Sequence, residues 1–188
     1  MVAQSGSRKE VDLTDAERLR WCQPRLSLGH HELRGAGDEV LGTLGFQAKS
    51  AVTWGFTDRR RALAEAGPAQ WQFSIERKGV VGALGLGATV HVTGTDSGEV
   101  AARAFFITGI LQLTNGRRFR WRGGMTENGP SAFLANSGEL LVRFEMGSIF
   151  DRVNTYVEVQ PEAAAVPERQ LLIALGLYLR LAMGKESR

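Results

Sequence analysis

The sequence contains a single cysteine, Cys22, so no disulfide bond can form within the chain. Chains poor in cysteine are typical of a reducing compartment, and we expect a cytoplasmic location. A nucleophilic cysteine needs a base and an orienting group, yet the only histidines are His30, His31 and His91. No pattern of a cysteine enzyme surrounds Cys22, so we interpret it as a thiol without a catalytic role. His30 and His31 are adjacent and would point to opposite faces of a strand, so we predict no metal site.

Lysine is also scarce, and arginine supplies nearly all of the positive charge. The only lysines are Lys9, Lys49, Lys78 and Lys185, whereas Lys and Arg together number 23 against 20 acidic residues. The net charge of +3 and the isoelectric point near 9.4 favour anionic partners. The excess is too small to predict nucleic-acid binding, and we expect none.

The first residues carry no targeting pattern. Residues 1–10 have no apolar run and no small-residue cleavage site, which argues against a secretory leader. Val2 rather than glycine follows Met1, which excludes N-myristoylation. We expect residues 1–9 to form a mobile tail and residues 10–184 to form one domain, because the length and composition are ordinary for a single domain.

Motifs of nucleotide-binding and catalytic sites are absent from the sequence. Residues 79–87 are rich in glycine, but they contain no Lys-Ser or Lys-Thr pair and the GxGxxG spacing is not met. We predict an apolar loop at the rim of the domain there; the alternative is a loop that touches a membrane or closes over a ligand.

The acidic residues Glu145, Asp151 and Glu158 lie near the expected end of the domain, but a catalytic pair needs a cleft and a separation that the sequence does not supply. We therefore nominate no catalytic residue and no cofactor, and favour a non-enzymatic role.

A series of strand patterns makes up most of the chain. In residues 71–76 every second residue is large and apolar, which places Trp71, Phe73 and Ile75 on one buried face. Asn115-Gly116 is the strongest hairpin signal, because both central residues of the tightest turn take positive φ. The other expected strands cover residues 25–34, 38–46, 88–94, 99–107, 109–114, 117–122, 131–135, 139–145 and about 152–159.

Helical patterns occur at both ends. Thr14 and Glu17 have capping-box spacing and predict a short helix over about 13–22, ending before Pro24. At the other end, residues 168–183 are apolar on every side of a helix. Such a helix is buried either in protein or in membrane. It would span about 24 Å at about 1.5 Å per residue, shorter than the roughly 20 residues that cross a bilayer, and Arg180 interrupts its end. We predict a buried core helix and no transmembrane span, with a membrane tail anchor as the alternative.

A helix surrounded by apolar contacts needs a sheet that curves around it on all sides. A meander of about ten to twelve antiparallel strands, closed into a barrel, would supply that sheet and leave no open edge. The predicted fold is therefore mainly β: a closed antiparallel β-barrel around a central hydrophobic C-terminal helix.

A long meander containing Phe119-Arg120-Trp121-Arg122 and Leu140-Leu141-Val142-Arg143-Phe144 precedes the apolar segment 171–181. In this order of elements the chain resembles, over about residues 20–183, the tubby-like superfamily of tubby C-terminal domains, LURP-one-related proteins and phospholipid scramblases. It is also similar to small bacterial proteins of that superfamily. The resemblance implies a barrel that encloses a hydrophobic helix and a general theme of lipid or ligand binding. Scramblases carry a cysteine-rich acylated stretch and a calcium-binding segment that this chain lacks, so the resemblance implies no individual site residue.

Two groups of arginines are the candidate binding residues. On a strand, Arg118, Arg120 and Arg122 would share the outer face while Phe119 and Trp121 face the core. Three guanidinium groups in a row can bind phosphates in bidentate fashion, although the same residues also suit a solvated face. A second cluster, expected in a loop, consists of Arg59, Arg60 and Arg61.

These observations predict a non-enzymatic binding or scaffold protein. Its expected partner is an anionic phospholipid or a small anionic ligand, and its expected location is the cytoplasm, peripheral at the membrane if the ligand is a lipid. The alternative is a small-molecule carrier or enzyme with a pocket at the mouth of the barrel.

Overall fold

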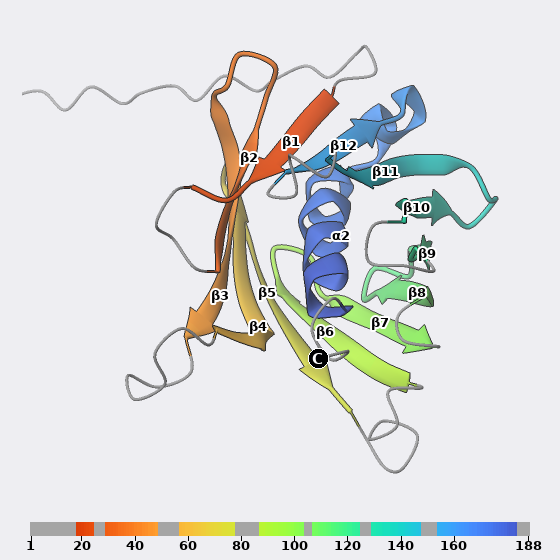
Figure 1. Ribbon diagram of the computed structural model, residues 1–188. Coiled ribbons are helices and arrows are strands. Elements are labelled where there is room, and N and C mark those ends of the chain that lie inside the picture. The colour runs from red at the N-terminus through yellow and green to blue at the C-terminus, as the bar shows by residue number, and fades with distance from the viewer. Residues whose placement is uncertain are drawn as a thin grey trace, which may run out of the picture.

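The computed structural model describes residues 18–24, 29–48, 57–77, 87–103, 107–124, 129–147 and 154–183. These residues form strands, one 3-10 helix and one α-helix (Figure 1). The strands are β1 (Arg18–Cys22), β2 (His30–Arg34), β3 (Val40–Ala48), β4 (Thr57–Ala66), β5 (Ala69–Glu76), β6 (Gly87–Gly94), β7 (Gly98–Arg103), β8 (Thr108–Leu113), β9 (Arg118–Arg122), β10 (Ser131–Ala135), β11 (Leu140–Met146) and β12 (Thr155–Val159). The helices are η1 (Pro161–Ala165) and α2 (Arg169–Met183).

The strands β1–β12 form one closed antiparallel barrel. Each strand pairs with its neighbours in sequence, and β1 pairs with β12 to close the ring, with Leu19 opposite Val157. Closure leaves none of these strands with an unpaired edge. The predicted closed antiparallel barrel is confirmed, and its strand number lies within the predicted range.

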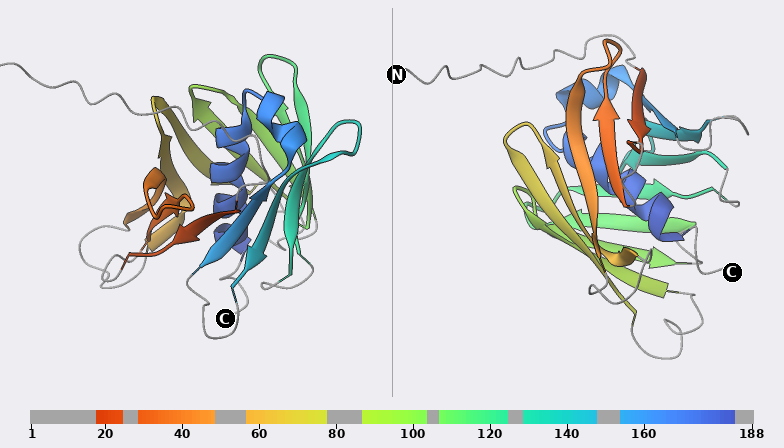
Figure 2. Two further views of the ribbon diagram at one scale, coloured as in Figure 1. Left: turned by 90° about the horizontal axis from the view of Figure 1, so that it is seen from above. Right: turned by 60° about the vertical axis from the view of Figure 1, so that its left-hand side comes forward.

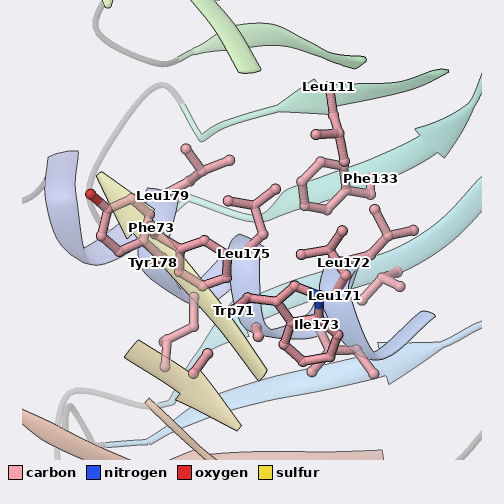
Figure 3. Close-up of a cluster of buried hydrophobic side chains, with 14 of the residues drawn as sticks. Trp71, Phe73, Leu111, Phe133, Leu171, Leu172, Ile173, Leu175, Tyr178 and Leu179 are labelled. Carbon is pink, nitrogen blue, oxygen red and sulfur yellow. The ribbon is translucent and has the colours of Figure 1, made fainter. Parts of the chain in front are cut away.

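Helix α2 runs through the middle of the barrel, as both views of Figure 2 show. All residues from 171 to 179 are buried, and α2 packs against strands on different sides of the ring, including β4 and β10. Figure 3 shows Leu175, Tyr178 and Leu179 of the helix among inward-facing side chains such as Phe73 and Phe133. The prediction of a central core helix is therefore confirmed.

Arg180 is the charged residue within the apolar part of α2, and its side chain reaches the segment at the start of β10. Its Nη1 donates to the carbonyl oxygen of Gly129 at 2.9 Å and to Oγ of Ser131 at 2.7 Å. Partial burial lowers the pKa of the Arg180 guanidinium, but an arginine stays charged at neutral pH, and these acceptors stabilise the partly buried charge.

No helix among the described residues has the length and apolar character needed to cross a membrane.

Three hairpins share one turn geometry. In the β8–β9 turn, the amide of Gly116 donates to the carbonyl of Leu113 at 3.0 Å, and the amide of Leu113 donates to the carbonyl of Arg117 at 2.9 Å. This is a three-residue turn whose last residue is left-handed, with φ of 86° at Gly116. Gly138 and Asp38 occupy the same position in the β10–β11 and β2–β3 turns, with φ of 102° and 62°. The expectation that Asn115 also has positive φ was wrong, because the loop is one residue longer than the two-residue turn assumed.

The predicted helix over 13–22 was also wrong where the structure describes it. Residues 18–22 form β1, with Leu19 and Trp21 buried and Arg18 exposed. The capping-box spacing is a local signal, and the pairing of β1 with β2 and β12 outweighs it. Residues 13–17, like the expected tail 1–9 and most of the glycine-rich loop 79–87, lie outside the described residues.

Candidate functional site

The arginines of β9 lie on the outer surface of the barrel. Burial alternates along this strand: Phe119 and Trp121 are buried, and Arg118, Arg120 and Arg122 are exposed. The inward rings pack in the core, where the ring centroids of Trp121 and Phe133 are 4.8 Å apart. The predicted division of faces is confirmed, because strand alternation and apolar burial give the same register.

The second predicted cluster of arginines lies in a strand and not in the loop that we expected. Arg59, Arg60 and Arg61 belong to β4 rather than to a loop. They lie where the register of β4 against β3 shifts, between Asp58 and Ala62, and Arg61 lies opposite Ser74 of β5. The side chain of Arg61 is exposed, and those of Arg59 and Arg60 lie outside the description. Strands β5 to β8 separate β4 from β9 in the ring, which is about 24 Å along the sheet at about 4.8 Å per strand. The two clusters therefore do not form one site.

A groove on the outer surface runs across β7 to β10 beside two of the predicted arginines. We call it the arginine groove, and its volume is about 360 Å³, within the size range of small-molecule sites. It is lined by Ala101, Arg103, Thr108, Gly109, Ile110, Arg120, Trp121, Arg122, Leu134 and Gly138. Arg118 is not part of this lining, since it lies one step farther along β9, opposite Gln112.

The register of the sheet assembles this groove. Thr108 of β8 lies opposite Arg103 of β7 on one side and opposite Arg122 of β9 on the other. In the next row toward the β8–β9 turn, Ile110 lies opposite Arg120. Sequence reasoning missed Arg103, because a lone arginine at the end of a strand has no local signal; only the pairing of β7 with β8 reveals its position.

Two of the three groove arginines have their hydrogen-bonding capacity unused. Arg120 Nη2 donates to the carbonyl oxygen of Asn136 at 2.9 Å, and Gly138 leaves room for it, since a Cβ there would lie 3.1 Å from that nitrogen. Arg103 and Arg122 are exposed and make neither an ion pair nor a hydrogen bond with any described residue. The β10–β11 turn therefore positions one guanidinium, and the other two remain available to a ligand.

The lining of the arginine groove suits binding of an anion. Its described residues include no carboxylate that would neutralise the arginines, and guanidinium groups bind phosphate or carboxylate oxygens in bidentate geometry. The hydroxyl of Thr108 is a further donor, and Ile110, 51% exposed, offers an apolar surface. Since the described lining residues also include no histidine or cysteine, they offer no histidine–nucleophile pair.

A second hollow, which we call the mixed-charge hollow, lies over β11, β12 and β1. Its volume is about 630 Å³, and both arginines and acidic residues line it. None of the arginines predicted as binding residues is among its lining. Glu145 and Glu158, noticed in the sequence but not nominated, both belong to it.

The histidines and the cysteine do not form a metal site among the described residues. Cys22 Sγ donates to the carbonyl oxygen of Glu32 at 3.6 Å. His91 lies on the outer surface between two carboxylates, with Nε2 3.1 Å from Glu76 and Nδ1 3.5 Å from Glu99.

Comparisons with known proteins found no match to this chain among family models, curated proteins or solved structures. Its function is therefore inferred from the geometry of the two hollows.

Proposed function

We propose that this is a non-enzymatic binding protein that takes an anionic group, the phosphate of a lipid headgroup or of a small ligand, into the arginine groove. The observation that carries the proposal is the meeting of Arg103, Arg120 and Arg122 at a groove that no acidic residue lines in the part of the chain that the structure describes. A merely solvated surface would mix charges of both signs, as the mixed-charge hollow does.

The geometry suits a phosphate ester better than a bare ion. Arg103 and Arg122 flank Thr108 across β7, β8 and β9, so their guanidinium groups can approach one phosphate from two sides. Ile110 and Leu134 lie beside Arg120 in the same lining and can contact the organic part of a ligand. The tubby-like resemblance, with its theme of lipid binding, is in keeping with this proposal, and a location at the inner surface of a membrane goes with it.

The test compares binding of the protein to lipid vesicles with its binding to a soluble phosphate ester. Flotation is measured with vesicles of phosphatidylglycerol and phosphatidylcholine and with vesicles of phosphatidylcholine alone, and calorimetry is run with glycerol phosphate. One basic side chain near an anionic surface contributes about 1 kcal/mol. We therefore expect Arg103→Gln and Arg122→Gln each to weaken binding about fivefold, and the double variant about thirtyfold. Salt should weaken binding of the wild type as well.

The matched comparison is Arg61→Gln, which removes the same charge from the distant β4. Flotation with the anionic vesicles alone would identify a lipid headgroup as the source of the phosphate, and binding of glycerol phosphate without flotation would identify a free ligand. If Arg61→Gln weakens binding as much as the groove variants do, net charge rather than the groove is responsible. Absence of binding to both probes would also refute the proposal.

The alternative of a carrier or enzyme with a pocket at the barrel mouth draws less support from the packing. Residues 171–179 fill the axis of the barrel, and both the arginine groove and the mixed-charge hollow lie on its outer surface.

A further inference from the structure

The mixed-charge hollow is a second place where this barrel can hold a ligand. It lies over β11, β12 and β1, which in Figure 1 lie together near the top of the view, whereas β7 to β10 lie on the right. The turn between β2 and β3 forms one wall, through Gly35, Ala36 and Asp38. The volume of about 630 Å³ is ample for a small molecule.

Most of the charges in this hollow are already paired. Arg20 Nη2 lies 2.9 Å from Asp38 Oδ1, and Arg143 Nη2 lies 2.6 Å from Glu145 Oε1. These two ion pairs account for four of the charged side chains in the lining, and the other two are Arg18 and Glu158.

Arg18 and Glu158 carry opposite charges and face the hollow side by side. They are Cα partners in the β1–β12 ladder, and directly opposed side chains start about 5 Å apart at Cβ. Neither makes an ion pair or a hydrogen bond with another described residue. The hollow therefore offers one donor group and one acceptor group, both unused and fixed on adjacent strands.

The wall of the hollow is held in place before any ligand arrives. Asp38 has a left-handed backbone, with φ of 62°, and its carboxylate is shared by two arginines. Arg20 approaches Oδ1, and Arg34 Nη1 donates to Oδ2 at 2.8 Å. The hydrogen bond of Arg34 to Glu32, together with the nearby Asp38 carboxylate, raises the pKa of the Arg34 guanidinium. A fixed wall lowers the ordering cost of binding.

An aromatic ring completes the lining. Tyr156 lies on the outer face of β12, two residues before Glu158, and is 40% exposed. In the sheet it lies between Arg20 on β1 and Glu145 on β11. An ammonium group near Glu158 would gain from the carboxylate and from the face of this ring.

We propose that the mixed-charge hollow binds a small zwitterion, with its anionic group on Arg18 and its ammonium group against Glu158 and the ring of Tyr156. Free phosphoethanolamine and the headgroup of a zwitterionic phospholipid share this chemistry. The site is separate from the arginine groove, since the two linings have no residue in common.

Calorimetric titration of the full chain tests the proposal with three soluble probes: phosphoethanolamine, inorganic phosphate and ethanolamine. Phosphoethanolamine should bind at least about fivefold more tightly than either of the other two, because only it uses both unpaired side chains. Arg18→Gln and Glu158→Gln should each weaken it by at least about fivefold. The matched controls Arg61→Gln and Glu162→Gln, which remove the same charges elsewhere on the surface, should leave its affinity unchanged.

Flotation with phosphatidylethanolamine vesicles identifies the source of the zwitterion. Flotation that Glu158→Gln abolishes identifies a lipid headgroup, and soluble binding without flotation identifies a free zwitterion. The proposal is overturned if phosphoethanolamine does not bind. It is also overturned if inorganic phosphate binds equally well and Glu158→Gln has no effect, because the hollow then recognises an anion alone. Should Arg18→Gln lower the melting temperature, the comparison rests on Glu158→Gln and on the three soluble probes.

Discussion

The packing of α2 against β11 leads to a prediction that opposes ordinary helix propensity. Gly176 lies in the middle of α2, and a Cβ added there would meet the ring of Phe144. The three atoms nearest to this Cβ would all belong to the ring, and even the most distant of them, Cε1, would lie only 2.8 Å from it. Phe144 is fully buried, and its ring centroid is 6.0 Å from that of Trp121. The ring therefore has little freedom to move aside.

The size of the effect follows from two opposing contributions. Alanine is favoured over glycine in a helix by about 1 kcal/mol, and overpacking of a dense core costs about 1–3 kcal/mol. A contact with three ring atoms puts Gly176→Ala at the upper end of that cost. We expect a net loss of about 2 kcal/mol in the free energy of unfolding, which corresponds to roughly 4–8 °C in Tm for a domain of this length.

Urea denaturation followed by tryptophan fluorescence measures the change, because Trp21, Trp71 and Trp121 are buried. The matched control is Gly45→Ala, since a Cβ at Gly45 would meet only Nδ1 of His30 among the described atoms, at 3.8 Å. This control should be neutral or slightly stabilising, by up to about 1 kcal/mol.

A double-mutant cycle tests whether the ring is the cause. In a Phe144→Leu background the flat ring is gone, so Gly176→Ala should cost at least about 1 kcal/mol less than it does in the wild type. If Gly176→Ala instead raises the melting temperature, as helix propensity alone predicts, the contact with Phe144 does not restrict this position and the reasoning fails.

Two further pairs of variants test the core and the end of the barrel. Leu175→Asp should prevent folding, because it places an unpaired charge at a fully buried position. The control Leu63→Asp changes a residue that is 46% exposed and should fold normally, as measured by circular dichroism. An unchanged melting temperature for Leu175→Asp would show that α2 is not part of the core. Arg117→Ala should lower the free energy of unfolding, measured by urea denaturation, by about 1–3 kcal/mol, because Arg117 lies 2.7 Å from the buried carboxylate of Glu168 next to the start of α2. The control Arg118→Ala removes an exposed arginine that has no ion pair among the described residues. It should change the free energy of unfolding by no more than about 0.5 kcal/mol. Equal effects of the two arginine variants would contradict this reading of the ion pair.

Part of the arginine groove was predictable from local patterns. The alternation in residues 118–122 places three arginines outside and two aromatic rings inside, since a strand with one buried face has its register determined by where its apolar residues lie. The same alternation does not show which strand lies beside β9. Arg103 joins the groove through the pairing of β7 with β8, and Arg59 to Arg61 are kept away from it by the strands between β4 and β9.

The sequence by itself determined the architecture. An apolar segment shorter than a membrane span favoured burial in protein over a membrane tail anchor, and a succession of alternating segments around it favoured a closed sheet. Local signals misled at residues 18–22, where helix-capping residues precede a strand, at Asn115, where the turn is one residue longer than assumed, and at Arg59 to Arg61, which lie in a strand.

Only the tertiary structure decided that β1 exists and that Arg18 lies opposite Glu158 in the closing ladder. Pairing between the two ends of the chain is set by closure of the ring, and closure is a property of all the strands together. For that reason a pattern within one strand predicts which face a side chain occupies, while the partners on that face depend on the fold.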